Sequence, residues 1–198
     1  MLPIKTDHMK YLEDMEPTDP SIMNAVLEKM EQYDYSIYTA WDVRRALCEG
    51  IRSLEDFAAL LSPAAAPFLE EMAHKAQEET RKHFGTSICM FTPLYIANYC
   101  ENHCVYCGFN CRNKIHRAKL NQEEIERELQ AIAATGLQEI LLLTGESRSM
   151  SSVEYIGEAV KLAASYFTTV GIEIYLLNTE EYAYLHSCGA DFVSVYQE

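Results

Sequence analysis

The chain has 198 residues, of which 48% are hydrophobic and 23% charged, and it carries a formal net charge of −14. This composition is typical of a globular protein with one domain and at most a small appendage. The negative charge argues against partners such as nucleic acid or an anionic membrane, because long-range repulsion opposes both.

The sequence contains no signal-peptide core at its start and no run of roughly 18 apolar residues that would span a bilayer. It therefore predicts a cytoplasmic protein, whose thiols stay reduced. In that compartment, clustered cysteines indicate metal or redox chemistry before disulfides.

Residues 1–85 are expected to form an N-terminal helical extension. Three helix starts are indicated by a hydroxyl that can accept a free backbone N–H: Ser21, Thr39 and Ser53. The last two are followed three residues later by a carboxylate, which is typical of a capping box. Residues 64–84 follow as a longer helix with Gly85 as its stop.

Residues 86–198 alternate between strand and helix patterns. Strands are expected at 87–99, 139–144, 172–177 and 191–196, and helices at 121–136, 153–166 (with Ser151 as a possible cap) and 179–189. Gly171 comes before or within the third strand. Such alternation predicts an α/β fold with a parallel sheet and right-handed crossovers, either a barrel or an open doubly wound sheet.

Two groups of polar residues follow neighbouring strands. A cysteine-rich loop follows the first strand, and Thr144-Gly145-Glu146 follows the second. In parallel α/β folds the chemistry lies at the carboxyl ends of the strands. Both groups are therefore expected at one rim of the sheet.

The cysteine loop reads C-E-N-H-C-V-Y-C-G-F-N-C from Cys100. Cys100, Cys104 and Cys107 have the spacing C-x3-C-x2-C, which can wrap a cubane and place three thiolates on three irons. The fourth iron would then have no protein ligand, and an open position distinguishes a reactive metal site from a structural one. The spacing favours a [4Fe–4S] cluster of this open kind.

Two closed sites remain as alternatives from the spacing. Cys111 can supply a fourth thiolate to the cluster, which would make the protein a non-enzymatic iron–sulfur electron carrier. Zinc can instead be held by Cys104, Cys107 and a pair drawn from Cys100, Cys111, His103 and His116, in a zinc-binding module. The chain lacks the distant second C-x2-C that commonly completes such a zinc site.

The segment C-E-N-H-C-V-Y-C resembles the signature of the radical S-adenosylmethionine (SAM) enzymes. Five further segments resemble the tyrosine lyase branch of these enzymes: L-S-P-A-A-A-P-F-L-E-E-M-A, F-T-P-L-Y-I-A-N-Y-C, N-K-I-H-R-A-K-L, L-L-L-T-G-E-S-R and V-Y-Q-E. Within that branch they are most similar to the 2-iminoacetate synthase family of thiamine biosynthesis. The resemblance runs from about Leu54 to the last residue.

The resemblance implies a radical SAM (β/α) barrel of the TIM type and assigns several residues. Cys100, Cys104 and Cys107 match the cluster ligands, and Cys111 lies outside the motif as a bystander. SAM would occupy the fourth iron. The remaining residues are implied to bind SAM: Thr144, Gly145 and Glu146 its methionyl amine, Glu173 its ribose hydroxyls, and Tyr106 its adenine. For Glu173, a carboxylate paired elsewhere in the barrel is an equal alternative.

A basic run follows the cysteines, formed by Arg112, Lys114, Arg117 and Lys119. Its positive charge could stabilise a reduced cluster or bind a carboxylate, since reduction potentials respond to nearby charge. For at least half of these residues, a solvated surface loop is the simpler interpretation.

The family resemblance implies cleavage of the Cα–Cβ bond of L-tyrosine, giving 2-iminoacetate and p-cresol. Implied partners are the thiazole synthase that consumes the imine and a flavodoxin- or ferredoxin-like electron donor. A nearby alternative is the tyrosine lyase of [FeFe]-hydrogenase maturation (HydG-like), which carries additional cysteines beyond the matched region.

Family members are considerably longer than this chain, whose sequence accounts for about half a barrel, or four βα units, after the helical extension. Half a barrel is expected to expose sheet edges and an uncovered interior. We therefore expect the 198-residue chain to be inactive as a lyase unless a second chain completes the barrel.

Overall fold

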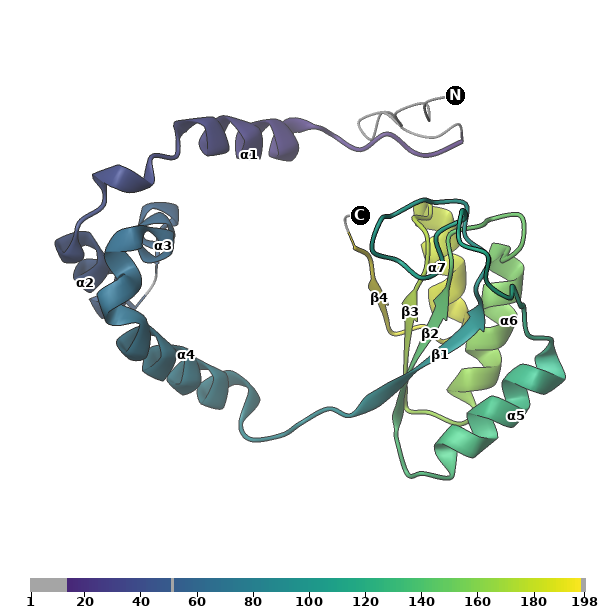
Figure 1. The fold of residues 1–198 in the computed structure, drawn as a ribbon. Helices are drawn as coiled ribbons and strands as arrows, with labels where there is room; N and C mark the ends of the chain where they lie inside the picture. The colour runs from purple at the N-terminus through teal and green to yellow at the C-terminus, as the bar shows by residue number, and fades with distance from the viewer. Residues whose placement is uncertain (1–13, 51, 197–198) are drawn as a thin grey trace. The chain divides into compact units, whose positions relative to one another are not determined.

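A computed structural model describes residues 14–50 and 52–196 (Figure 1). The start of the chain and the last two residues of the V-Y-Q-E segment lie outside this range. Among the described residues, 18–88 form one compact unit, and 14–17 form a second unit together with 89–196. The division falls three residues beyond the expected boundary at 85/86, and it assigns 14–17 to the unit that contains the sheet.

The first unit is helical. It contains α1 (Ser21–Gln32), η1 (Tyr35–Ile37), α2 (Ala40–Cys48), α3 (Leu54–Leu61), η2 (Pro63–Phe68) and α4 (Leu69–Phe84). Its small core gathers side chains from α2 and η2, with Val43, Leu47 and Ala65 buried.

The helix starts at Thr39 and Ser53 are confirmed as capping boxes. Asp42 accepts the backbone N–H of Thr39 at 2.9 Å, and Asp56 accepts that of Ser53 at 3.0 Å. Helix α1 does begin at Ser21, but the prediction that the Ser21 hydroxyl accepts a free backbone N–H of the helix is wrong. The Ser21 hydroxyl donates to Asp19 at 2.9 Å instead of capping the helix.

The single helix expected over residues 64–84 is also wrong at its start. The chain forms the 3-10 helix η2 as far as Phe68, and the α-helix begins only at Leu69. Pro67 explains the difference, because it has no N–H to donate and its ring clashes with the preceding turn of an α-helix. Gly85 ends α4 as predicted, with a φ of 66°.

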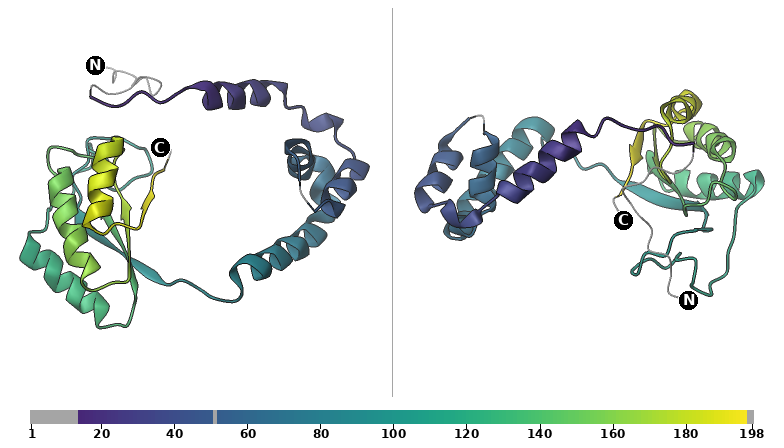
Figure 2. Two further views of the ribbon diagram at one scale, coloured as in Figure 1. Left: turned by 180° about the vertical axis from the view of Figure 1, so that it is seen from behind. Right: turned by 90° about the horizontal axis from the view of Figure 1, so that it is seen from above.

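The second unit contains a parallel sheet. Within the described residues, its strands are β1 (Phe91–Ala97), β2 (Glu139–Thr144), β3 (Thr169–Glu173) and β4 (Phe192–Ser194), in the order β1-β2-β3-β4. The connecting helices are α5 (Gln122–Ala133), α6 (Val153–Ala164) and α7 (Thr179–Cys188). Figure 2 shows these helices on one face of the sheet, which confirms the expected partial α/β barrel.

Several boundaries in this unit differ from prediction. The first strand is Phe91–Ala97 instead of 87–99, the fourth is Phe192–Ser194 instead of 191–196, and α5 ends at Ala133, three residues before Gly136. The third strand was expected over residues 172–177, but β3 ends at Glu173 and has Gly171 in its interior. Gly171 is paired there with Phe192, whose ring fills the space that a Cβ would need. Of the two placements expected for Gly171, the one within the strand is therefore correct. The cap of α6 is Ser152, not Ser151, which is fully buried.

The core lies between the sheet and its helices. It is formed by alternate residues of the strands and by the apolar faces of the helices: Leu94, Ile96, Ile140, Leu142, Val170, Ile172, Ile125, Leu129, Ile156 and Leu185. The other face of the sheet carries the register row of Tyr95, Leu143, Glu173 and Ser194. Because side chains alternate along a strand, Glu173 projects from the face opposite the helices.

Residues 14–17 are attached to the start of α7. Asn178 donates to the Asp14 carbonyl at 2.8 Å and accepts the Glu16 N–H at 3.0 Å. The Glu16 carboxylate in turn accepts the Thr179 hydroxyl at 2.7 Å. The segment is thus fixed by one amide side chain and by a carboxylate at a helix N-terminus, where negative charge is favoured.

None of the helices in the described part of the chain is both long and apolar enough to cross a membrane.

Candidate cofactor site

Two segments meet at the carboxyl ends of β1 and β2, as the sequence predicts. They are the loop of residues 98–121 after β1 and the turn of residues 144–146 after β2. The Gly145 N–H donates to the Ala97 carbonyl at 3.1 Å, and the Glu101 N–H donates to the Glu146 carbonyl at 2.9 Å. These backbone bonds continue the pairing of the two strands beyond the sheet itself.

Gly145 lies directly against the backbone of the cysteine loop. A Cβ at this position would be 3.0 Å from the Cβ of Cys100 and in still closer conflict with the Tyr99 carbonyl. The family resemblance assigned Gly145 to the binding of the SAM amine. In the structure, it also permits close approach of the loop that carries the cysteines.

The three motif cysteines belong to that loop, and a turn joins Cys104 to Cys107. Cys100, Cys104 and Cys107 are half-buried, whereas Cys111 is exposed. The Cys107 N–H donates to the Cys104 carbonyl at 3.3 Å, and the Asn110 amide donates to the same carbonyl at 2.8 Å. The backbone of the loop is therefore folded around Cys104.

Within the described residues, no group of three or more His, Cys, Asp or Glu side chains is already gathered as a metal site. The donor set still suits iron, since three half-buried thiols on one folded loop are the ligands that iron–sulfur clusters take. Thr144 Oγ1, next to Gly145, is buried and lacks a hydrogen-bond partner in the part of the chain that the structure describes. A buried hydroxyl of this kind suits a polar ligand at the rim.

Glu146 is held at both its backbone and its side chain. Asn102, inside the C-x3-C segment, donates to Glu146 Oε2 at 2.6 Å. The neighbouring Glu101 carboxylate accepts the Ser147 hydroxyl at 2.7 Å. The sequence predicted Glu146 as a ligand residue but gave no indication of Asn102, because this contact joins residues 44 positions apart.

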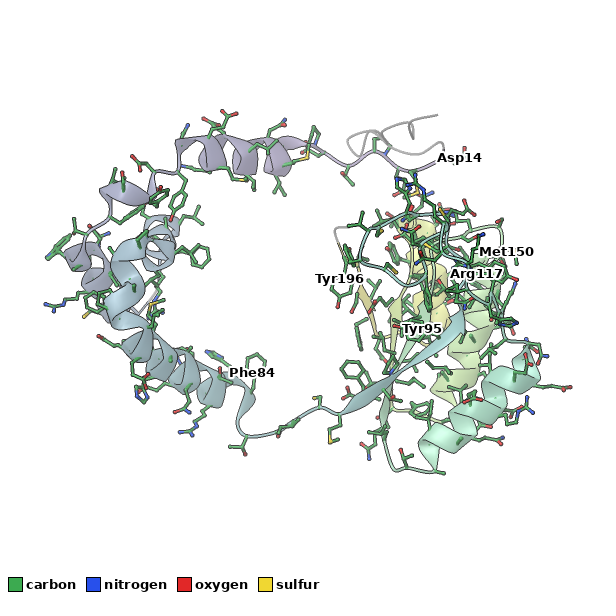
Figure 3. The ribbon with its side chains drawn as sticks, viewed as in Figure 1. Asp14, Phe84, Tyr95, Arg117, Met150 and Tyr196 are labelled. Atoms are coloured by element: carbon green, nitrogen blue, oxygen red, sulfur yellow. The ribbon has the colours of Figure 1, made fainter. Side chains whose placement is uncertain are left out.

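The basic run divides into two parts. Arg117, labelled in Figure 3, donates to the carbonyls of Asn98 at 2.6 Å, Phe109 at 2.8 Å and Asn110 at 2.7 Å. Lys119 lies over the Tyr155 ring, with Nζ 4.1 Å from the centroid. These two residues contribute to loop structure, whereas Arg112 and Lys114 are exposed.

The two remaining predicted residues differ in their surroundings. Glu173 is half-buried on the face opposite the helices, and burial raises the pKa of its carboxyl above the ordinary value. Tyr106, between Cys104 and Cys107, is 73% exposed. The structure thus places Glu173 on the sheet and Tyr106 on the cysteine loop.

Residues 94–198 match the model of the radical SAM superfamily, and the chain belongs to that superfamily. Its members use a [4Fe–4S] cluster and S-adenosylmethionine. The chain is 42% identical over 160 residues to the 2-iminoacetate synthase of Salmonella typhimurium, an alignment that covers 81% of this chain and 42% of the relative. The resemblance read from the motifs is confirmed.

Other relatives share the fold and differ in name. The 3-methylornithine synthase of Methanosarcina acetivorans is 29% identical, over 77% of this chain and 44% of the relative. Among solved structures, HydG, a maturase of the [FeFe]-hydrogenase, matches with a TM-score of 0.73 and 26% identity over 91% of this chain and 41% of its own. The structure of methylornithine synthase (PylB) matches with a TM-score of 0.57 and 25% identity, over 83% of this chain and 46% of its own. The chain spans less than half the length of these relatives.

Proposed function

We propose that this chain forms the cofactor-binding half of a 2-iminoacetate synthase-like barrel, which cleaves the Cα–Cβ bond of L-tyrosine. Its products would be p-cresol and the 2-iminoacetate used for the thiazole of thiamine. The observation that carries the proposal is the packing of the turn at Gly145 and Glu146 onto the loop of Cys100–Cys107. This contact brings the cysteines proposed to hold the cluster next to Gly145 and Glu146, which are proposed to bind SAM.

In this proposal Cys100, Cys104 and Cys107 hold a [4Fe–4S] cluster, and Cys111 is spare. When bound, the cluster and SAM together supply hydrogen-atom abstraction from the substrate. The Glu146 carboxylate would accept a charge-assisted hydrogen bond from the SAM ammonium.

The other residues bind or orient SAM. The hydroxyl of Thr144 offers a further polar contact beside Glu146, and Gly145 keeps the approach open. Glu173, on the face opposite the helices, would accept hydrogen bonds from the ribose hydroxyls, and Tyr106 would contact the adenine. Arg117 keeps the cysteine loop folded through its three carbonyl contacts.

The substrate and partners follow from the similarity to 2-iminoacetate synthases. L-Tyrosine is the substrate, a flavodoxin- or ferredoxin-like protein is the electron donor, and thiazole synthase receives the imine. We place the reaction in the cytoplasm, where iron–sulfur thiolates are kept reduced.

The open sheet limits the tyrosine-cleaving activity that we expect from this chain. The described strands form a sheet that is not closed on itself, and apolar side chains on its non-helical face, Tyr95 and Phe192, are 50% and 44% exposed. A closed (β/α)8 barrel has eight strands. We therefore expect a polypeptide of these 198 residues to bind its cofactors and to be inactive in tyrosine cleavage until the remaining strands of a barrel are supplied.

Anaerobic reconstitution tests the proposal. The reduced protein should give a [4Fe–4S] EPR signal that SAM changes, and p-cresol should appear only when the complementary half of the barrel is supplied. A signal that SAM leaves unchanged would favour a closed electron-carrier cluster, and zinc without iron would favour the zinc-binding module. Turnover by the chain alone would contradict the requirement for a second half.

A HydG-like function is the second candidate, favoured by the structural match with a TM-score of 0.73. The sequence identity to 2-iminoacetate synthase, 42%, exceeds the 26% identity to HydG, and it ranks the synthase first.

A further inference from the structure

Asn102 lies between two of the cysteines and contacts the proposed SAM-binding carboxylate. Its Nδ2 donates to Glu146 Oε2 at 2.6 Å, and both residues are half-buried. A hydrogen bond to an ionised acceptor is roughly twice as strong as a neutral one. The amide fixes one carboxylate oxygen of Glu146 and leaves Oε1 for another donor.

The backbone reinforces this arrangement. The Glu101 N–H donates to the Glu146 carbonyl at 2.9 Å, one residue before Asn102. On the other side of Asn102, its carbonyl accepts the Cys111 N–H at 2.8 Å, which ties it into the folded cysteine loop. The main chain of Asn102 is therefore held by these hydrogen bonds. Its side-chain amide in turn holds the Glu146 carboxylate in place.

Resting on the proposed function, we infer that Asn102 is a positioning residue that couples the cysteine loop to SAM binding through Glu146. The folded cysteine loop holds Asn102 in place, and Asn102 holds the carboxylate that would receive the SAM ammonium. Because such coupling is reciprocal, bound SAM also stabilises the cluster loop.

Asn102→Leu tests the inference, because leucine has a similar volume and no hydrogen-bond donor. Cysteine ligation remains, so the iron and sulfide content and the EPR signal without SAM should match wild type. The affinity for SAM, measured anaerobically by titration calorimetry, should fall by about 10- to 100-fold, the range typical of partners that orient a ligating group. The SAM-induced change in the EPR signal should weaken in parallel.

Asn110→Leu is the matched control. Asn110 belongs to the same loop, but its amide donates to the Cys104 carbonyl. Its replacement should lower cluster content or lifetime, whereas the SAM affinity of cluster-loaded protein should stay at the wild-type value. If both variants lost cluster and SAM binding together, Asn102 would be a loop-folding residue and the inference would be wrong.

A double-mutant cycle with Glu146→Gln separates the remaining outcomes. If Asn102 acts through Glu146, Asn102→Leu should weaken SAM binding far less in the Glu146→Gln background than in wild type. Equal losses in both backgrounds would contradict the inference. If Asn102→Leu bound SAM with wild-type affinity, the inference about Asn102 would be overturned and the proposed function would stand. Failure of the wild-type protein to bind SAM would instead remove the proposed function, and the inference with it.

Discussion

Gly145 and Tyr99 are in direct backbone contact: a Cβ on Gly145 would lie 2.8 Å from the carbonyl carbon of Tyr99. Tyr99 immediately precedes the first motif cysteine, and Gly145 immediately precedes Glu146. The distance between the cysteine loop and the carboxylate is therefore set by the absence of a side chain at one position. The site depends on this contact as much as on its ligating groups.

Gly145→Ala should displace the cysteine loop, because the obstructing atoms belong to backbone and cannot rotate away. We expect a loss of about 1–3 kcal/mol in the free energy of unfolding, the usual cost of overpacking, and a lower iron content after reconstitution. Denaturant unfolding and iron analysis measure these effects. Gly108→Ala is the control, since it lies in the same loop and a Cβ there has no heavy atom within 4 Å; an equal loss in both would contradict the packing argument.

Arg117→Lys should loosen the cysteine loop although it keeps the charge. The planar guanidinium reaches three carbonyls, whereas an ammonium on a flexible stem cannot reproduce that geometry. Hydrogen bonds from charged donors contribute about 1.5–3 kcal/mol each, so stability and cluster lifetime should both fall.

Arg112→Ala provides the comparison for Arg117, since it removes an exposed charge from the same basic run. It should leave the stability nearly unchanged and affect at most the reduction potential of the cluster, measured by redox titration. A larger destabilisation by Arg112→Ala than by Arg117→Lys would show that charge, not loop geometry, governs this segment.

Tyr175→Phe should destabilise the protein most below pH 10. Burial raises the pKa of Tyr175 to about 12, from an ordinary value of about 10, and its hydroxyl donates to the Ser151 carbonyl. The folded protein holds the phenol proton more tightly than the unfolded chain. The stability from Tyr175 is therefore fully present below pH 10 and is lost as the pH rises through 12.

The stability difference between wild type and Tyr175→Phe should therefore shrink over that interval, which urea unfolding at a series of pH values would reveal. Burial also raises the pKa of Tyr155 to about 12, and Tyr155→Phe should show the same trend. A difference independent of pH in both variants would refute this account.

Asn178→Asp should release residues 14–17 without weakening α7. Aspartate keeps an acceptor for the helix cap but lacks the amide hydrogen that Asn178 donates to the Asp14 carbonyl at 2.8 Å. Aspartate still accepts the Glu16 N–H, so hydrogen exchange at that amide should accelerate only through the lost bond to Asp14, and less than in Asn178→Ala. Amides within α7 should keep their protection in Asn178→Asp. Asn178→Ala removes cap and donor together, so both regions should then exchange faster; unchanged exchange at Glu16 in both variants would count against the attachment.

Much of the fold was predictable because its signals are local. The capping boxes at Thr39 and Ser53 and the stop at Gly85 depend on residues within one helical turn, and the structure confirms them. The errors at Ser21 and at the start of α4 were also local, since Asp19 accepts the Ser21 hydroxyl and Pro67 lacks an N–H. Gly171 was expected before or within the third strand, and the sheet decides between the two: it lies inside β3, where the ring of Phe192 occupies the space that a Cβ would need.

The sequence by itself determined the chemistry available to this protein: three thiols at C-x3-C-x2-C spacing, a Thr-Gly-Glu turn after a second strand, and the parallel order that brings both to one rim. Only the tertiary structure decided how these parts are held together. Asn102 contacts Glu146, and Arg117 contacts Asn98, across separations of 44 and 19 residues. Such contacts depend on the register of the folded sheet, which no short stretch of sequence specifies, because period and capping act only between near neighbours.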